Sequence, residues 1–402
     1  MRFRNTIVLS GLCVSVSAGA DVDGFLNPNK LWSTSLMGEP TKVVASIEGE
    51  SFAVCWSAGP GLMVASVHDV VTGGLDSDAA LASVPALSAA DVAWSPTANR
   101  LAIGYLSVDG LKRTRLIDTS SSLPVGVDQI GDRVALDKTG TMMVVGGADS
   151  YVRVIDATNG EVLRAFVFEG DLLDVDVDST GGVVGASGKN GVIEAWDMAT
   201  GESLFRVNPP QTSEGPDLVT ISISPGCTYV GSGAGQSSSS EADRGRALVW
   251  RISDGSLVYD RQVVDGGLSR VAWTDVETEL VMLGIDNSGG FYLAAWDLLQ
   301  DRTVVSITPA DAELLGGVND FDFDRAGYVW AIASGSGVVE AFEPGHACTG
   351  DLNADDEVNG GDLALLLADW GAARAVSDLN GDGAVDGTDL AMLVGHWGPC
   401  SN

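Results

Sequence analysis

Basic side chains are scarce in this 402-residue chain. It contains 22 Lys and Arg against 55 Asp and Glu, which gives a formal net charge of −33 at pH 7. Contacts to nucleic-acid phosphates need a basic surface, so this balance argues against a nucleic-acid-binding protein. The same excess of carboxylates favours solubility and attracts cations.

Histidine is rarer still, with three residues at His68, His346 and His396. None of them lies near a nucleophile motif, and no G-x-S-x-G sequence occurs, so Ser–His–acid and Cys–His hydrolases lack the residues they need. No group of His and Cys has the spacing of zinc ligands. Carboxylates are therefore the remaining candidates for catalysis, and the sequence does not select a pair among them.

Long apolar runs are also absent. The stretch 7–16 is mostly apolar but too short to span a bilayer, and it lies between Arg2 and Arg4 and an A-x-A site at 18–20. This arrangement is typical of a secretory signal peptide, so we expect residues 1–20 to be removed. The mature chain is then predicted to be secreted and soluble, without a membrane span. A buried N-terminal strand is the alternative.

Four of the five cysteines remain after such a cleavage. In an oxidising compartment, cysteines pair where geometry allows. Cys348 and Cys400 closely bracket an acidic C-terminal segment, and we expect a disulfide between them. Cys55 and Cys227 lie in distant parts of the main body and are expected to be unpaired, buried thiols.

The chain does contain a repeated β pattern. Its 45% hydrophobic residues and 51 glycines suit a β-rich protein with tight turns. A short alternating strand, a turn and a strand of small residues recur seven times, starting at residues 44, 92, 134, 175, 221, 271 and 321. Repeats of 41 to 50 residues predict a β-propeller with one four-stranded blade per repeat. An open pair of packed β-sheets is the alternative.

The ends of the repeat array predict how the propeller closes. A single blade cannot bury both of its faces, so the blades must form a ring. The last repeat lacks a fourth strand after residue 342, and the segment 31–36 precedes the first repeat. We therefore expect 31–36 to supply the outermost strand of the last blade. The predicted domain covers residues 31–345.

The third strand of the repeats ends on an aromatic or apolar residue followed by Asp. At 196–197 and 296–297 this is a Trp-Asp dipeptide, and these stretches resemble WD40 repeats. The Asp-x-x-Thr-Gly turn at 197–201 is also similar to quinoprotein-like propellers. The resemblance implies an all-β, seven-bladed propeller. No repeat has the Gly-His dipeptide of WD40 blades, and the adjacent Cys pair of quinone-dependent enzymes is missing, so a quinone-dependent dehydrogenase is disfavoured.

Acidic residues of the repeats fall into two groups. Asp156, Asp197 and Asp297 follow third strands, where we expect them to turn the chain and accept backbone hydrogen bonds. Alternating Asp residues at 174–178 and 320–324 are expected on the solvated side of a strand, or alternatively near the centre or rim of the ring. The Ser-rich insertion 235–246 in the fifth repeat is expected to be a flexible surface loop, with ligand binding as the alternative.

Two similar acidic dodecamers, 351–362 and 378–389, follow the repeats. A twelve-residue calcium loop takes oxygen ligands from positions 1, 3, 5, 7, 9 and 12, with the backbone carbonyl used at position 7. The dodecamers therefore predict two calcium ions. Position 6 is Gly383 in the second loop but Asp356 in the first, so the first site is expected to be weaker. The expected ligands are Asp351, Asn353, Asp355, Glu357, Asn359, Asp362, Asp378, Asn380, Asp382, Ala384, Asp386 and Asp389.

A short amphipathic helix is expected after each loop, ending at Gly371 and Gly398. Each predicted helix has apolar residues at i, i+3, i+4 and i+7, and we expect the two faces to pack against each other. These residues are Leu363, Leu366, Leu367, Trp370, Leu390, Leu393, Val394 and Trp397. Residues 348–402 contain ten acidic residues and one basic residue, Arg374, so cation binding should be coupled to folding.

The duplicated loop–helix segment resembles a type I dockerin. The shared features are the ligand positions, Val358 and Val385 at position 8, Asp at position 12 and the tandem copy. Over residues 348–402 the resemblance implies calcium-dependent docking to a cohesin-like or cell-surface protein. It also implies a secreted bacterial protein that is extracellular, on the cell surface or periplasmic. Positions 10 and 11, which commonly help to choose the cohesin, depart from the usual hydroxyl-rich pairs.

The sequence leaves two functions open. The first is a secreted, non-catalytic propeller that binds a protein or glycan and is docked through its C-terminal module. The lack of a catalytic constellation favours it. The alternative is a polysaccharide-degrading enzyme, a glycoside hydrolase or lyase, whose carboxylates lie in the propeller. Its support is analogy with the enzymes that carry dockerins.

Overall fold

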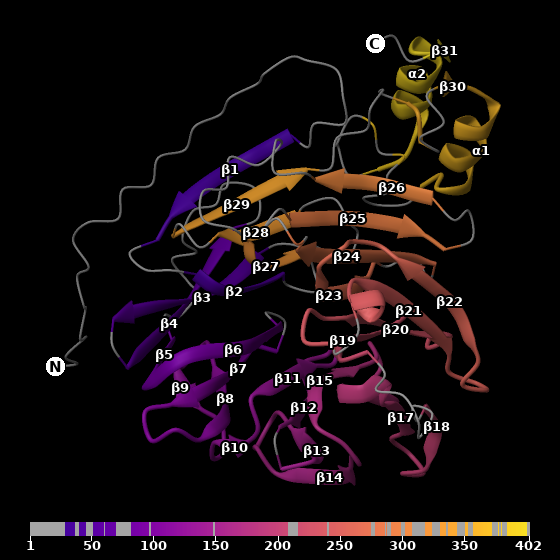
Figure 1. Cartoon of the computed structure of the whole chain (residues 1–402). Helices are drawn as coiled ribbons and strands as arrows, with labels where there is room; N and C mark the ends of the chain where they lie inside the picture. Colours follow the sequence, from indigo (N-terminus) through magenta and orange to yellow (C-terminus); the bar gives the residue numbers. More distant parts are fainter. Residues whose placement is uncertain are drawn as a thin grey trace, which may run out of the picture.

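The architecture is described by a computed structural model of the chain (Figure 1). It describes residues 29–36, 40–45, 51–59, 61–69, 82–95, 98–147, 149–207, 216–238, 241–274, 278–285, 287, 291–298, 302–307, 318–323, 330–334, 337–343, 350–352, 357–371, 377, 379 and 384–399. The predicted signal peptide, residues 1–20, lies outside these ranges.

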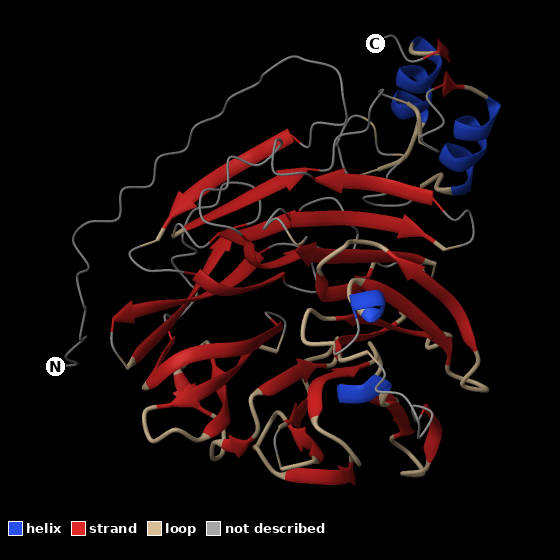
Figure 2. Ribbon diagram, in the orientation of Figure 1, coloured by secondary structure: helices blue, strands red, loops and turns tan. Residues whose placement is uncertain are grey.

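Seven antiparallel sheets form a ring, and each sheet corresponds to one predicted repeat (Figures 1 and 2). Blade 1 contains β2 (Pro40–Ala45), β3 (Ser51–Gly59), β4 (Leu62–Asp69) and β5 (Ala82–Val84). Blade 2 contains β6 (Ala86–Ser95), β7 (Arg100–Ser107), β8 (Lys112–Asp118) and an outer strand in two pieces, β9 (Leu123–Pro124) and β10 (Gln129–Ile130). Blade 3 contains β11 (Arg133–Leu136), β12 (Met142–Gly146), β13 (Tyr151–Asp156) and β14 (Val162–Val167).

The remaining blades follow the same order from inner to outer strand. Blade 4 contains β15 (Leu172–Val177), β16 (Val183–Gly188), β17 (Ile193–Asp197) and β18 (Ser203–Val207). Blade 5 contains β19 (Leu218–Ile223), β20 (Tyr229–Ala234), β21 (Arg246–Arg251) and β22 (Leu257–Gln262). Blade 6 contains β23 (Gly267–Trp273), β24 (Glu279–Ile285), β25 (Phe291–Asp297) and β26 (Arg302–Ile307). Blade 7 contains β27 (Val318–Phe323), β28 (Trp330–Ser334), β29 (Val338–Glu343) and β1 (Asn29–Ser35).

Strand β1 closes the ring. It pairs antiparallel with β29, from Asn29 opposite Glu343 to Ser35 opposite Val338. The first strand of the chain is therefore the outermost strand of the last blade, which confirms the predicted closure. The open pair of sheets is excluded, because backbone hydrogen bonds join the two ends of the array.

The core of the propeller lies between blades rather than within them. The buried apolar side chains of the described propeller residues form seven clusters, and each cluster joins two adjacent blades. Between blades 4 and 5, for example, Ile193 packs in one cluster with Leu218 and Ile221. The small residues of the second strands make this approach possible: a Cβ on Gly185 would lie 2.8 Å from Ile221 Cδ1. The alternating side chains thus bury both faces of each blade against its two neighbours.

Carboxylates shape the turns as expected. Asp156 accepts a hydrogen bond from the backbone N–H of Thr158 (2.8 Å), and Asp197 accepts one from that of Thr200 (2.7 Å). These bonds confirm the turn role for both residues. The side chain of Asp297 lies outside the described residues.

The Ser-rich insertion of blade 5 is more tightly held than its composition predicts. Its described residues include the 3-10 helix η2 (Glu241–Asp243), and a second such helix, η1 (Lys189–Gly191), lies in blade 4. Ser238 is buried, and its hydroxyl accepts a hydrogen bond from the backbone N–H of Asp217 (2.9 Å). Arg244 donates to the Ser238 carbonyl oxygen (3.0 Å). The first contact anchors the insertion to its blade, and the second joins the two described parts of the insertion.

Two cysteines of the main body are described, and neither forms a disulfide within the described part of the chain. Cys55 is buried, and burial raises the pKa of its thiol to about 12. Cys227 is half-buried, and its Sγ donates to Asp178 Oδ2 (3.2 Å). Cys348 and Cys400 lie outside the described residues, so the disulfide between them stays a prediction.

The C-terminal module consists of β30 (Glu357–Val358), α1 (Gly360–Ala368), α2 (Gly387–Gly395) and β31 (Gly398–Pro399). Its core contains the fully buried residues Val358, Leu366, Val385 and Leu393. Leu363 and Leu390 are partly buried against this core. Among the residues that the structure describes, no helix is long and apolar enough to cross a membrane.

Half of each predicted apolar helix face is not part of this core. Leu367 and Val394 are each 53% exposed, and Trp370 and Trp397 are 49% and 51% exposed. The expectation that the two faces pack against each other is thus confirmed for Leu363, Leu366, Leu390 and Leu393, which share one core, while the other half of each face stays exposed. Each helix has nine residues and buries about one residue per turn. The rest of the small core is formed by Val358 and Val385, which come from the loops before the helices.

Candidate functional site

The two acidic loops of the C-terminal module enter their helices in the same way. Asn359 and Asp386 are the N-caps, with φ, ψ of −144°, −159° and −143°, −158°. In each case the N-cap side chain accepts a hydrogen bond from the first turn, and the carboxylate three residues later accepts one from the N-cap N–H. This is a capping box, which fixes the last residues of each loop.

The carboxylates at position 12 are buried at the centre of the two loops. Asp362 Oδ1 accepts from the backbone N–H of Leu352 (2.8 Å), and Oδ2 accepts from that of Asn359 (2.7 Å). This one carboxylate thus joins the beginning and end of its loop. Asp389 Oδ2 likewise accepts from the backbone N–H of Asp386 (2.8 Å). Both aspartates are 0% exposed.

The donor chemistry of this module fits calcium. Asp351, Asp362 and Asp389 are all buried, at 1% exposure or less. Burying carboxylates is costly unless a positive charge or hydrogen bonds compensate, and residues 348–402 contain a single basic residue. Carboxylate, amide and carbonyl oxygens are the ligands that calcium prefers. A hard divalent cation is the compensation that this composition calls for.

The structure describes seven of the twelve expected ligands and places them at the start and end of the loops. They are Asp351, Glu357, Asn359, Asp362, Ala384, Asp386 and Asp389. The other five, Asn353, Asp355, Asp378, Asn380 and Asp382, lie outside the described residues. Within the described part of the chain, no three His, Cys, Asp or Glu side chains are gathered as in a metal site. The described residues thus fix the frame of each loop rather than its full ligand set.

The fold and these loops together define a β-propeller protein with a duplicated, calcium-loop docking module. Comparison with known families then identifies that module: residues 349–396 match the dockerin type I domain. The chain therefore carries a type I dockerin domain after a seven-bladed propeller. Dockerin domains bind calcium and dock to cohesin in a calcium-dependent manner. No curated protein shows a significant match to the chain.

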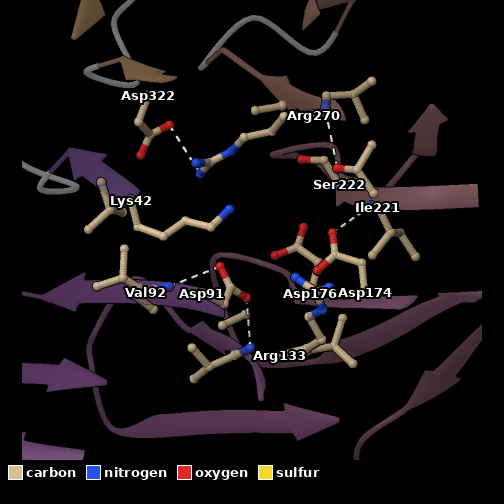
Figure 3. Close-up of a pocket in the computed structure, with 18 of the residues that line it drawn as sticks. Lys42, Asp91, Val92, Arg133, Asp174, Asp176, Ile221, Ser222, Arg270 and Asp322 are labelled. Atoms are coloured by element: carbon tan, nitrogen blue, oxygen red, sulfur yellow. Dashed lines mark hydrogen bonds and ion pairs between the residues drawn. The ribbon is translucent and has the colours of Figure 1, made fainter. Parts of the chain in front are cut away.

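A second candidate site lies at the centre of the propeller. The inner strands of all seven blades surround a cavity of about 190 Å³. Charged side chains from six of these strands lie around the cavity (Figure 3). They are Lys42, Asp91, Arg133, Asp174, Asp176, Arg270 and Asp322.

The acidic side chains of this cavity join neighbouring blades. Asp174 accepts from the backbone N–H of Ile221 in the next blade (2.9 Å), and Asp176 accepts from that of Ile223 (2.7 Å). Asp91 accepts in the same way from blade 3, through the N–H of residue 134 (2.9 Å). These bonds replace the backbone pairing that the inner edges of the sheets lack.

The same arrangement occurs where the ring closes. Asp320 accepts from the N–H of Val43 (3.1 Å), and Asp322 accepts from that of Ala45 (2.8 Å). The interpretation of these aspartates and of Asp174 and Asp176 as a solvated strand side is therefore wrong, and the alternative near the ring centre is correct. The inner strands of a propeller surround its central axis. Along these strands, residues of the interblade core alternate with polar residues that line the central cavity, which we call the channel. Asp324 lies outside the described residues.

A periodic signal in the sequence could have located this channel. In six of the seven repeats, the residue immediately before the start of the repeat is polar. These residues are Asp91, Arg133, Asp174, Thr220, Arg270 and Asp320. Their common position in the repeat places them at one level around the axis. Arg133 and Arg270 belong to no motif of their own, so only this shared repeat position predicts that they face the axis.

Arg270 is the main cation of the closing junction. Its guanidinium lies 3.3 Å from Asp320 and 3.4 Å from Asp322, and it donates to the carbonyl oxygen of Phe321 (2.9 Å). Burial alone would lower the pKa of Arg270, but the two carboxylates outweigh it and raise this pKa. Lys42 adds a weaker ion pair to Asp320 (3.7 Å).

The pKa of Asp174 is strongly perturbed in the channel. Burial and the nearby charge of Asp91 raise its pKa to about 7, although Arg133 acts in the opposite direction. Burial also raises the pKa of Asp322, with Arg270 opposing it. A carboxyl group that titrates near neutrality can serve as a general acid or base. It also makes the stability of the propeller depend on pH.

We expect Asp174→Asn to stabilise the propeller at alkaline pH. The folded pKa is raised, so the folded state holds the Asp174 proton more tightly than the unfolded state does. This contribution is complete below about pH 4 and is lost as the pH rises through about 7. Asparagine keeps an acceptor for Ile221 and removes the charge. Chemical denaturation at pH 5 and pH 8 measures the effect.

The control for this prediction is Asp171→Asn in the same blade. The Asp171 side chain is 73% exposed and pairs with Lys189 at the surface. It should leave the pH dependence of stability unchanged. If Asp174→Asn has the same pH profile as the wild type, the carboxyl group is not perturbed in the folded protein.

Proposed function

We propose that this chain is a secreted, non-catalytic adaptor of a bacterial cell. Its propeller binds a protein or glycan, and its dockerin domain attaches it to a cohesin-bearing scaffold or a cell-surface protein. The observation that carries this proposal is the matched pair of loop–helix units, each closed around a buried position-12 aspartate. Dockerin domains typically belong to extracellular or cell-surface proteins, which supports export through residues 1–20 and a final location outside the cytoplasm.

Two calcium ions are proposed for the dockerin domain, one in each loop. The ligands would be the twelve residues predicted from loop positions. The described frame supports this assignment, because Asp351 and Asp362 stand at opposite ends of the first loop and are both buried. The second loop has an equivalent capping box, which supports the proposal of a calcium ion there too.

The exposed apolar residues of the two helices are proposed as the cohesin-docking surface. Leu367 on α1 and Trp370 just after it correspond to Val394 on α2 and Trp397 just after it, and all four are about half exposed. Large apolar residues exposed in matched positions mark an interaction surface. Tryptophan is also the residue most enriched where binding energy concentrates.

Replacing both tryptophans tests this surface. Trp370→Ala with Trp397→Ala should weaken capture of the full-length protein by immobilised cohesin modules roughly tenfold or more, in the presence of calcium. The matched control is Leu257→Ala, because Leu257 is 48% exposed on the outer strand of blade 5. Undiminished capture of the tryptophan variant would place the docking surface elsewhere.

One observation favours the enzyme alternative. Asp174, with a pKa of about 7 and Asp91 close by, has the properties of a catalytic carboxyl group. Against it, the cavity of about 190 Å³ is smaller than the roughly 300 to 1,000 Å³ of typical ligand sites. A panel of polysaccharides separates the two functions. If the wild type cleaves a polysaccharide and Asp174→Asn does not, the protein is a hydrolase or lyase rather than a non-catalytic adaptor.

A further inference from the structure

One end of blade 2 exposes an unusual group of apolar side chains. Leu87 is 53% exposed, Val108 61%, Leu111 55% and Ile130 60%. We call these four residues the blade 2 tip. They come from the start of β6, the hairpin between β7 and β8, and the end of β10.

Strand pairing brings these residues together. Ser107 and Lys112 flank the hairpin that contains Val108 and Leu111. Ile130 lies opposite Arg113, next to that hairpin, and the residues on both sides of Leu87 pair with residues 106 and 107. The neighbouring hairpin of blade 1 is in contact too, since a Cβ on Gly61 would lie 3.3 Å from Val108 Cγ1.

The equivalent hairpins of three other blades are built differently. They read GADS at 147–150, GKNG at 188–191 and GSG at 335–337. Small and polar residues are what an exposed hairpin needs for its turn. Val108 and Leu111 serve no such need, and both point away from the interblade core at more than half exposure. A contiguous exposed apolar group of this kind marks an interaction surface.

The charge distribution indicates which partner can reach this surface. Residues 86–167, which form blades 2 and 3, contain nine acidic and eight basic residues, whereas the whole chain has a net charge of −33. The charges next to the tip are paired within the chain: Arg113 with Asp109 (2.7 Å) and Lys112 with Asp132 (2.8 Å). A second copy of this chain is repelled by most of the molecule but not by this part.

We propose that the blade 2 tip is the interface of a symmetric homodimer. In a two-fold dimer each tip meets the same apolar residues of the other copy, and the commonest oligomers have this symmetry. The area of four side chains is below that of a standard interface, so the dimer is reversible, with a dissociation constant in the micromolar range.

Topology leaves the dockerin domains free in such a dimer. The tip lies at the end of the blades where inner strands begin, and β29 ends at Glu343 on the opposite end, from which the chain continues to residue 350. The dimer therefore presents two docking modules to a scaffold. Two linked modules bind more tightly than one through effective concentration.

Analytical ultracentrifugation of the full-length protein tests this proposal. The wild type should dimerise in the micromolar range, and more strongly at high salt, because salt screens the repulsion between two acidic chains. Val108→Asp with Leu111→Asp should weaken dimerisation roughly tenfold or more, because it buries charge in the interface. The control is Leu257→Asp. Leu257 lies on the outer strand of blade 5 and is 48% exposed.

A second variant protects the test against misfolding. Val108→Ser with Leu111→Ser gives the hairpin the small polar character of its counterparts and should also weaken the dimer. A wild type that stays monomeric at high concentration in both salts would overturn the proposal. Dimerisation that persists in both tip variants, or that is lost equally in the Leu257 control, would overturn it as well. None of these outcomes depends on cohesin binding.

Discussion

Chelation of calcium is expected to unfold the dockerin domain while the propeller stays folded. The domain buries three described carboxylates and has ten acidic residues against one basic residue over 348–402. Without a cation these charges repel one another, and the apolar core of four fully buried residues is too small to offset that repulsion. Because the ligands must be brought together by folding, the free energy of calcium binding is largely free energy of folding.

Hydrogen exchange on the full-length protein measures this effect. Amides of α1 and α2 should exchange roughly a hundredfold faster after chelation, whereas those of the propeller strands should not change. Cohesin capture should be lost in the same samples and return when calcium is added. Protection of the two helices that persists in chelator would show that the module folds without a metal.

Substitution of the two position-12 aspartates should reproduce the chelated state. Asp362→Asn with Asp389→Asn removes both buried charges and one backbone acceptor from each loop. Calcium titration should then show no high-affinity binding. The matched control is Asp386→Asn, because Asn359 already occupies the equivalent position and caps α1. This control should still bind calcium.

Replacement of Asp320 should destabilise the propeller by about 3 kcal/mol. Asp320 is 3% exposed, and its carboxylate accepts from Val43 while pairing with Arg270 and Lys42. Asp320→Ala removes a hydrogen bond between blades 7 and 1 and takes one of two carboxylates away from the Arg270 guanidinium, which keeps its ion pair with Asp322. The loss is concentrated at the junction where the ring closes, so every blade is affected when it opens.

Guanidinium denaturation followed by tryptophan fluorescence measures this loss. Asp171→Ala is the control, since this side chain is 73% exposed and its ion pair with Lys189 lies at the surface. The control should denature close to the wild type. An Asp320 variant that also denatures with the wild type would mean that the channel carboxylates do not hold the blades together.

The propeller could be predicted from the sequence because its information is local and repeated. Each repeat has the same alternation of apolar and polar residues. The spacing of 41 to 50 residues is the length of one four-stranded blade. The missing fourth strand after residue 342 even predicted the pairing of β1 with β29. The calcium loops could be predicted for the same reason, since their ligands follow one another at fixed positions along the chain.

The sequence by itself determined the number of blades, the closure by the first strand and the frame of the two acidic loops. Only the tertiary structure decided where alternating residues face. Asp174 and Asp320 alternate like any half-solvated strand, but the ring turns their side of the strand toward a narrow axis. Trp370 and Trp397 follow a helical apolar stripe, yet they stay half exposed because the small core between α1 and α2 is already filled. Periodicity fixes which residues share a face, but what covers that face depends on elements far away in the chain.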